Sequence, residues 1–181
     1  MEKSLFGKSL KPPIPGEGTG GPAPKEPLSE PRAGAIGATK QTTEAEELKK
    51  NLHLFLNTNN DDLRKGALYK LKTHEFDQAF TPFLVRLMED DNFQNYRPDI
   101  IELIEKTKDP IAVPSLIATA RRHNGNNRND YQVRCASAAI QAIGEIGDEI
   151  AVPFLTEVAQ KWSDPEREKA REALQKMGIR I

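Results

Sequence analysis

The sequence predicts an all-α solenoid of about four helix pairs, preceded by a disordered tail. A short pattern occurs three times, in residues 77–84, 109–116 and 148–155. In each copy an aspartate is followed by an apolar residue two positions later, a proline five positions later and a leucine seven positions later. From about residue 48 apolar residues recur at helical spacing, and no segment alternates as a strand does. Repetition at about 30 to 40 residues is typical of stacked helix pairs.

The first segment, residues 1–42, differs in composition from the rest of the chain. It holds 7 of the 13 prolines and 7 of the 12 glycines, and its apolar residues follow no period. Such a segment cannot bury enough apolar surface to offset the entropy of ordering it, so we expect a disordered tail. Two roles stay open. The tail is either a plain linker or a tether whose tip, anchored by Leu5, Phe6 and Leu10, binds a groove on a partner.

The helical domain is expected at residues 43–181. Thr43 and Glu46 have the spacing of a capping box, which predicts a helix start at Thr43. The prolines of the pattern fall in first turns, where a missing N–H removes no hydrogen bond. Gly147 and Gly178 follow helices and can end them in the left-handed conformation. The expected pairs are 43–57 with 60–73, 77–89 with 92–106, 110–123 with 130–146, and 149–162 with 165–177.

The repeat length is uneven because of one polar loop. Pro82 and Pro114 are 32 residues apart, whereas Pro114 and Pro153 are 39 apart. The extra residues fall in the loop 123–130, within the third pair. Insertions of this kind map to loops. The loop is either a tolerated surface insertion or part of a functional face.

Residues 142–155, Ala-Ile-Gly-Glu-Ile-Gly-Asp-Glu-Ile-Ala-Val-Pro-Phe-Leu, closely resemble the junction of HEAT repeats of the short bacterial kind named after PBS lyases. Residues 164–174 resemble the following helix of that repeat. The resemblance extends over residues 43–181 and implies a right-handed stack in a bacterial protein. It also implies a ladder of aspartates and arginines between adjacent repeats. Its members would be Asp77, Asp109 and Asp148 on one rail, and Arg64, Arg97 and Arg167 on the other.

The second helices of such stacks line a concave surface, which is the expected binding face. For each candidate the alternative is an ordinary solvated helix face, and for the ladder residues it is a purely structural role between repeats. The candidates for partner binding are Arg64, Lys65, Tyr96, Arg97, Asp99, Ser137, Gln141, Arg171 and Gln175.

Several kinds of chemistry are not expected. With 26 basic and 27 acidic residues and a net charge of −1, the chain lacks the basic excess of a nucleic-acid binder. The three histidines are scattered, so we expect no metal site and no cofactor. Cys135 lies in an apolar run and is expected to be a buried core residue. A single cysteine fits a reducing compartment, and we expect a cytoplasmic protein without a membrane span.

We therefore expect a non-catalytic scaffold or adaptor that binds a protein partner on its concave face. One alternative is a chaperone of a chromophore resembling the bilin lyases. Another is a stabilising subunit of a larger complex, in which neighbours cover the apolar end formed by Ile179 and Ile181. The sequence leaves the partner and the oligomeric state open.

Overall fold

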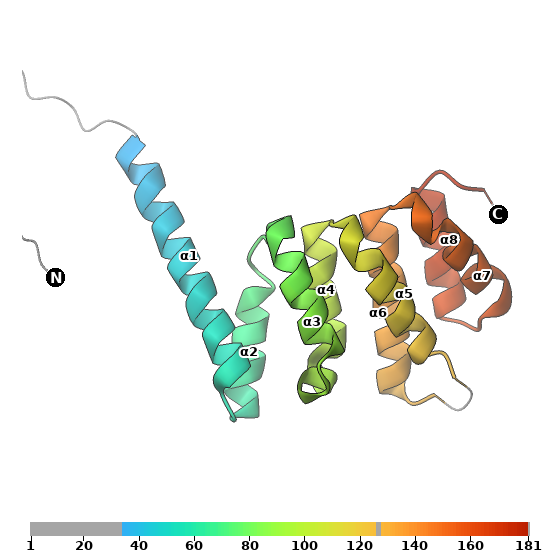
Figure 1. The fold of residues 1–181 in the computed structure, drawn as a ribbon, viewed down its shortest axis with the longest axis horizontal. Helices are drawn as coiled ribbons and strands as arrows, with labels where there is room; N and C mark the ends of the chain where they lie inside the picture. Colours follow the sequence, from blue (N-terminus) through green and yellow to red (C-terminus); the bar gives the residue numbers. More distant parts are fainter. Residues whose placement is uncertain (1–33, 126–127, 181) are drawn as a thin grey trace, which may run out of the picture. The chain divides into compact units, whose positions relative to one another are not determined.

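The computed structural model describes residues 34–125 and 128–180, with side chains from residue 44 onward (Figure 1). The chain divides after Thr39, and the unit that begins at Lys40 is described here by itself. All regular structure in the described residues is helical. The α-helices are α1 (Gly34–Asn57), α2 (Asp61–Leu71), α3 (Thr81–Glu89), α4 (Arg97–Thr107), α5 (Val113–Arg122), α6 (Asp130–Ile146), α7 (Val152–Lys161) and α8 (Glu166–Lys176). None of these described helices is both long and apolar enough to cross a membrane.

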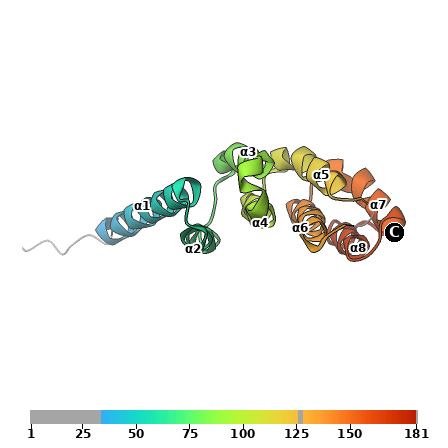
Figure 2. The ribbon, with the colours of Figure 1, turned by 90° about the horizontal axis from the view of Figure 1, so that it is seen from below.

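The helices form four consecutive pairs arranged in two layers. The layer of α3, α5 and α7 lies over the layer of α4, α6 and α8 (Figure 2). The predicted all-α repeat of helix pairs is therefore confirmed. We call the contacts between consecutive pairs the first, second and third junction, and the surface formed by α2, α4, α6 and α8 the even-helix face.

The repeated sequence pattern folds the same way each time. Its aspartate precedes a single 3₁₀ turn: η1 (Gln78–Phe80), η3 (Pro110–Ala112) or η4 (Glu149–Ala151). The carboxylates of Asp77, Asp109 and Asp148 accept a hydrogen bond from the backbone N–H two residues later, at 3.0, 3.1 and 2.9 Å. The proline of the pattern lies in the first turn of α3, α5 or α7, as predicted. A longer 3₁₀ segment, η2 (Asp91–Tyr96), precedes α4.

A continuous apolar core runs through the pairs and includes residues of all eight helices. Cys135 is fully buried in α6, as expected from its apolar surroundings. Trp162 ends α7 and packs edge-on against Phe154 with 5.8 Å between ring centroids. Gly147 and Gly178 have φ of 73° and 77°, which confirms the predicted left-handed helix ends.

The start of the first helix differs from the prediction. α1 begins at Gly34, so Thr43 lies inside the helix and does not cap it. Residues 34–42 contain alanine, isoleucine, lysine and glutamine but no proline, and two glycines lower helix propensity without preventing a helix. The predicted boundary at residue 42 therefore falls within α1. Leu5, Phe6 and Leu10, with the rest of residues 1–33, lie outside the described residues.

Candidate functional site

A groove of about 690 Å³ opens on the even-helix face between the first three pairs. Helix α2 supplies residues from successive turns on one side of the groove. The 3₁₀ segment η2 and helix α4 supply the middle, and α6 supplies one residue on the far side. The lining residues are Asp61, Lys65, Leu68, Tyr69, Lys72, Asn95, Tyr96, Asp99 and Arg134.

The apolar part of the groove comes from α2. Leu68 is buried, whereas Tyr69 is 73% exposed, more than any other large hydrophobic side chain of the described residues. A tyrosine offers a large, stiff ring and a hydroxyl, and for this reason it is enriched at protein interfaces. An exposed ring beside a buried leucine is therefore the natural anchor point for a partner.

Ion pairs fix the polar walls of the groove. Lys72 bridges from α2 to α4, where its Nζ lies 2.5 Å from Asp99 and 2.6 Å from Glu102. Burial disfavours the charged form of Lys72 and by itself lowers its pKa. The two carboxylates together have the larger effect, so the pKa of Lys72 is raised. Lys65 pairs with Asp61 at 2.5 Å and lowers the pKa of that carboxyl. The same carboxylate accepts a hydrogen bond from the hydroxyl of Tyr96.

Arg134 is the cation of the groove that remains available. It projects from α6 and is exposed. Among the residues with described side chains, none forms an ion pair with it. The groove thus combines an exposed ring, an apolar floor and a guanidinium that can donate to a carboxylate or a backbone carbonyl.

The structure brings some of the predicted binding residues together here. Lys65, Tyr96 and Asp99 line the groove. Gln141 is exposed on α6 and approaches Glu105 of α4 with 3.4 Å from its Nε2 to the carboxylate. Ser137 is half-buried and its hydroxyl has no hydrogen-bond partner among the described residues.

Two other predicted residues, Arg171 and Gln175, lie away from this groove on the fourth pair. They line a separate groove of about 1030 Å³ beside α7 and the C-terminal residues. The predicted face is therefore divided into two separate surfaces.

Arg64 and Arg97 connect pairs and do not present a free binding surface. Arg97 is only 4% exposed; its guanidinium donates to the carbonyl of Met88 at 2.6 Å and to the hydroxyl of Tyr131 at 3.2 Å. Arg64 is half-buried and donates to the carbonyl of Thr58 at 2.5 Å. Both guanidinium groups are committed to contacts inside the stack.

The predicted ladder of aspartates and arginines is wrong for the described side chains. Asp77, Asp109 and Asp148 cap their own 3₁₀ turns, and Arg167 pairs with Asp164 three residues earlier, at 2.7 Å. An aspartate that is already bonded to the backbone N–H two residues later points along its own chain, because that short ring fixes the side chain. Its carboxylate then makes no ion pair with the neighbouring pair.

Sequence reasoning missed Arg128, which makes the contact expected of an inter-repeat arginine. It lies at the end of the loop 123–130 and forms a bidentate pair with Glu166 of the fourth pair, at 2.5 and 3.2 Å. The Glu166 side chain is completely buried and that of Arg128 is 10% exposed. Arg128 and Glu166 are 38 residues apart in the sequence, and no local pattern indicates that they meet. The fold brings them together.

Comparison with known proteins agrees with this architecture. The sequence model of the PBS lyase HEAT-like repeat matches residues 136–161. The chain contains a HEAT-like repeat. The match covers most of α6, the 3₁₀ turn η4 and α7, and it includes the residues 142–155 in which the resemblance was recognised. No curated protein and no solved structure matches the chain.

The HEAT-like stack offers few groups for chemistry in its described part. No three histidine, cysteine, aspartate or glutamate side chains gather there in a way that could hold a metal ion. Burial raises the pKa of Cys135, which keeps this thiol protonated. His123 is buried, and burial followed by the charges of Arg97 and Arg122 lowers its pKa.

Proposed function

We propose that the chain is a non-catalytic protein-interaction module, and that a partner protein binds in the groove lined by Tyr69. The exposure of Tyr69 supports this most, because a large aromatic ring costs free energy in water and gains it when a partner covers it. The stacked HEAT-like pairs hold the ring on a rigid support. That rigidity reduces the entropy lost on binding.

The charges of the groove support the same function. The bridge from Lys72 to Asp99 and Glu102 joins α2 to α4, so the partner does not have to order these side chains. Arg134 remains free to form a charge-assisted hydrogen bond, which is about twice as strong as a neutral one. A segment with one apolar side chain and one carboxylate matches this arrangement.

Affinity purification followed by mass spectrometry tests the proposal with the full chain as bait. The wild-type chain is compared with Tyr69→Ala and with the matched control Ile111→Ala, which removes a similarly exposed apolar side chain outside the groove. We expect one set of proteins with the wild type and the control, and its loss with Tyr69→Ala. Identical proteins with all three baits, or none above background, would contradict the proposal.

A second variant tests what the charge of Arg134 contributes to the affinity for the partner. Arg134→Glu reverses the free charge of the groove without touching the core, because Arg134 is exposed. We expect it to weaken the captured partner's binding and to make that binding less sensitive to salt. Unchanged affinity would show that Arg134 does not contribute to binding.

A further inference from the structure

Most ion pairs between neighbouring helix pairs have the same direction along the stack. In the described residues six ion pairs join neighbouring pairs, and in five of them the cation belongs to the earlier pair and the carboxylate to the later one. These five are Lys72–Asp99, Lys72–Glu102, Lys108–Glu145, Arg121–Glu157 and Arg128–Glu166. The exception is Lys176, which reaches back to Glu145.

Arginine contacts with aromatic side chains have the same direction. The guanidinium carbon of Arg64 lies 5.5 Å from the ring centroid of Phe93 and 5.7 Å from that of Tyr96 in the next pair. The guanidinium carbon of Arg121 in the third pair lies 5.4 Å from the ring centroid of Phe154 in the fourth pair. Each pair therefore presents cations on its forward side, and the next pair supplies carboxylates or the negative face of an aromatic ring.

The forward side of the fourth pair carries the same kind of charge. Its groove of about 1030 Å³, which we call the end groove, is lined by Arg167, Arg171, Arg180, two glutamines, Ala159 and Ile179. Lys176 and Ala173 of α8 contact the third pair, through Glu145 and Gly144. The lining residues Arg167, Arg171 and Gln175 recur every four positions, so they lie along a different side of α8.

The positive charge of the end groove is only partly neutralised. Asp164 occupies Arg167 through two hydrogen bonds of 3.0 and 2.7 Å. Arg171 and Arg180 are exposed and form no ion pair with residues 44–125 or 128–180. No carboxylate is among the lining residues. Because the whole chain has a net charge of only −1, this is a local excess of positive charge.

We propose that the end groove docks a partner protein's helix that presents carboxylates, in the way that each following pair docks within the stack. Arg171 and Arg180 pair with those carboxylates, and the half-buried Ile179 contacts an apolar residue beside them. Gln160 and Gln175 are exposed in the same groove and can donate hydrogen bonds to the docked helix. This site is separate from the groove of Tyr69, and neither proposal depends on the other.

The test uses a helical alanine-based peptide with glutamates four residues apart, which places the carboxylates on one face of the helix. The same peptide with glutamine in place of glutamate is the neutral probe. Fluorescence anisotropy at low salt measures the binding of each to the full chain. We expect the glutamate peptide to bind and Arg171→Glu to weaken it about tenfold or more, since the reversal replaces attraction by repulsion.

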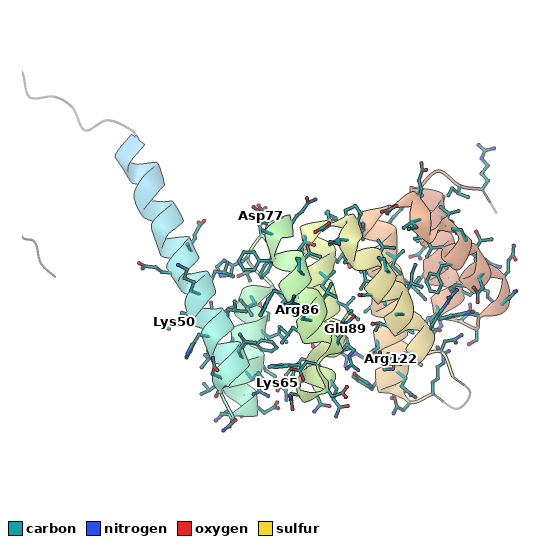
Figure 3. The ribbon with its side chains drawn as sticks, viewed as in Figure 1. Lys50, Lys65, Asp77, Arg86, Glu89 and Arg122 are labelled. Carbon is teal, nitrogen blue, oxygen red and sulfur yellow. The ribbon has the colours of Figure 1, made fainter. Side chains whose placement is uncertain are left out.

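Two control variants make the result specific. Arg122→Glu makes the same change of charge on an exposed residue at the end of α5 (Figure 3), and Tyr69→Ala disables the other groove. Both should bind the glutamate peptide as the wild type does. Arg180→Glu, outside any helix, repeats the test at a second position and should weaken binding without affecting the helices.

Three outcomes would overturn the proposal. Equal binding of the glutamate and glutamine peptides would show that carboxylates are not recognised. If Arg171→Glu and Arg122→Glu weaken binding of the glutamate peptide equally, the peptide is attracted by the overall charge of the chain and not by the end groove. Self-association of the wild-type chain in sedimentation, lost in Arg171→Glu, would assign the end groove to a second copy of the chain.

Discussion

The first and third junctions are built from opposite kinds of residue. At the first junction, Phe55 packs against Phe93 and Tyr96 with 5.4 and 5.6 Å between ring centroids, and the backbones of α2 and α4 stay mostly more than 8 Å apart. At the third junction, α6 and α8 approach along their lengths, with Gly144 directly against Ala173. Large rings can hold two pairs together across a wide gap, whereas close backbones require small residues.

The contrast explains where the family resemblance is strongest. The HEAT-like match at residues 136–161 includes Gly144, on the α6 side of the close-packed junction, and not the aromatic junction. A glycine or alanine at a close approach is dictated by the backbones, whereas several combinations of large side chains fill a wide gap equally well. The first pair therefore keeps the architecture of the repeat with little of its sequence.

Truncating the central ring of the first junction should have the largest effect. Phe55 is fully buried, so Phe55→Ala is expected to lower the free energy of unfolding by about 3–5 kcal/mol. Chemical denaturation monitored by circular dichroism measures this loss. The exposed Tyr69→Ala is the matched control and should change stability by no more than about 0.5 kcal/mol. A similar loss in both variants would contradict the picture of an aromatic core at this junction.

Breaking the buried ion pair of the third junction should have a comparable or slightly smaller effect. Glu166→Ala leaves Arg128 nearly buried without its carboxylate, and we expect a loss of about 3 kcal/mol. The exposed pair of Arg121 and Glu157 gives the control, because Glu157→Ala should cost at most about 1 kcal/mol. Urea unfolding of both variants tests the difference, and equal losses would show that burial does not govern these pairs.

The same substitution should have opposite effects in the two halves of the stack. A Cβ added at Gly144 would lie 2.5 Å from the Cβ and 3.0 Å from the Cα of Ala173, so Gly144→Ala must push α6 and α8 apart. We expect it to destabilise the protein by about 1–3 kcal/mol. A Cβ added at Gly66 in α2 meets nothing within 4 Å, so Gly66→Ala should stabilise by about 0.5–1 kcal/mol.

A compensating change makes this comparison sharper. In the double variant Gly144→Ala with Ala173→Gly, the side chain that causes the clash is moved to the other helix. Thermal unfolding should therefore show that much of the stability lost in Gly144→Ala returns. If Ala173→Gly adds its own loss instead, the effect of Gly144→Ala does not come from the contact with Ala173.

The smallest expected effect concerns pH at the second junction. His123 has a lowered pKa in the folded chain because of burial and the nearby Arg97 and Arg122. Below about pH 6.5 the unfolded chain therefore binds a proton that the folded chain does not. The free energy of unfolding should fall by up to about 1.4 kcal/mol per pH unit between pH 6.5 and the lowered pKa.

Denaturation at a series of pH values between 7 and 5 measures this slope. His123→Phe removes the titrating group and should flatten the dependence. An unchanged slope in His123→Phe would show that other groups control stability in this range. His123 has no hydrogen-bond partner for either ring nitrogen among the described residues, so its substitution breaks no such bond.

The sequence was sufficient for the helix pairs and their local caps. Proline in a first turn, glycine after a helix and the spacing of apolar residues are local rules, and α3, α5 and α7 follow them closely. The start of α1 at Gly34 was missed because a capping pattern at Thr43 shows where a helix can begin and not that it cannot begin earlier. Helix ends are the least certain feature of such reasoning.

The contacts of the candidate sites could not be predicted in the same way. Tyr69 was not recognised because its exposure is a property of the packed stack and not of the residues around it in the sequence. Arg97 and Tyr96 occupy a helix start that was expected on the surface, and the structure buries both. Arg128 precedes α6, so a pattern of arginines at matching positions within helices does not include it. Which side chains meet across a junction depends on the three-dimensional stacking.

The difference in backbone spacing also has a mechanical consequence. The first junction is held by side chains that reach across a gap, such as Phe55 and Lys72, and few backbone atoms come close there. At the third junction α6 and α8 approach closely, with Gly144 directly against Ala173, so more contacts have to break before these pairs separate. Pulled from its two ends, the helical stack would yield first between α2 and α4. A load on this protein would therefore reach the groove of Tyr69 before it disturbed the end groove.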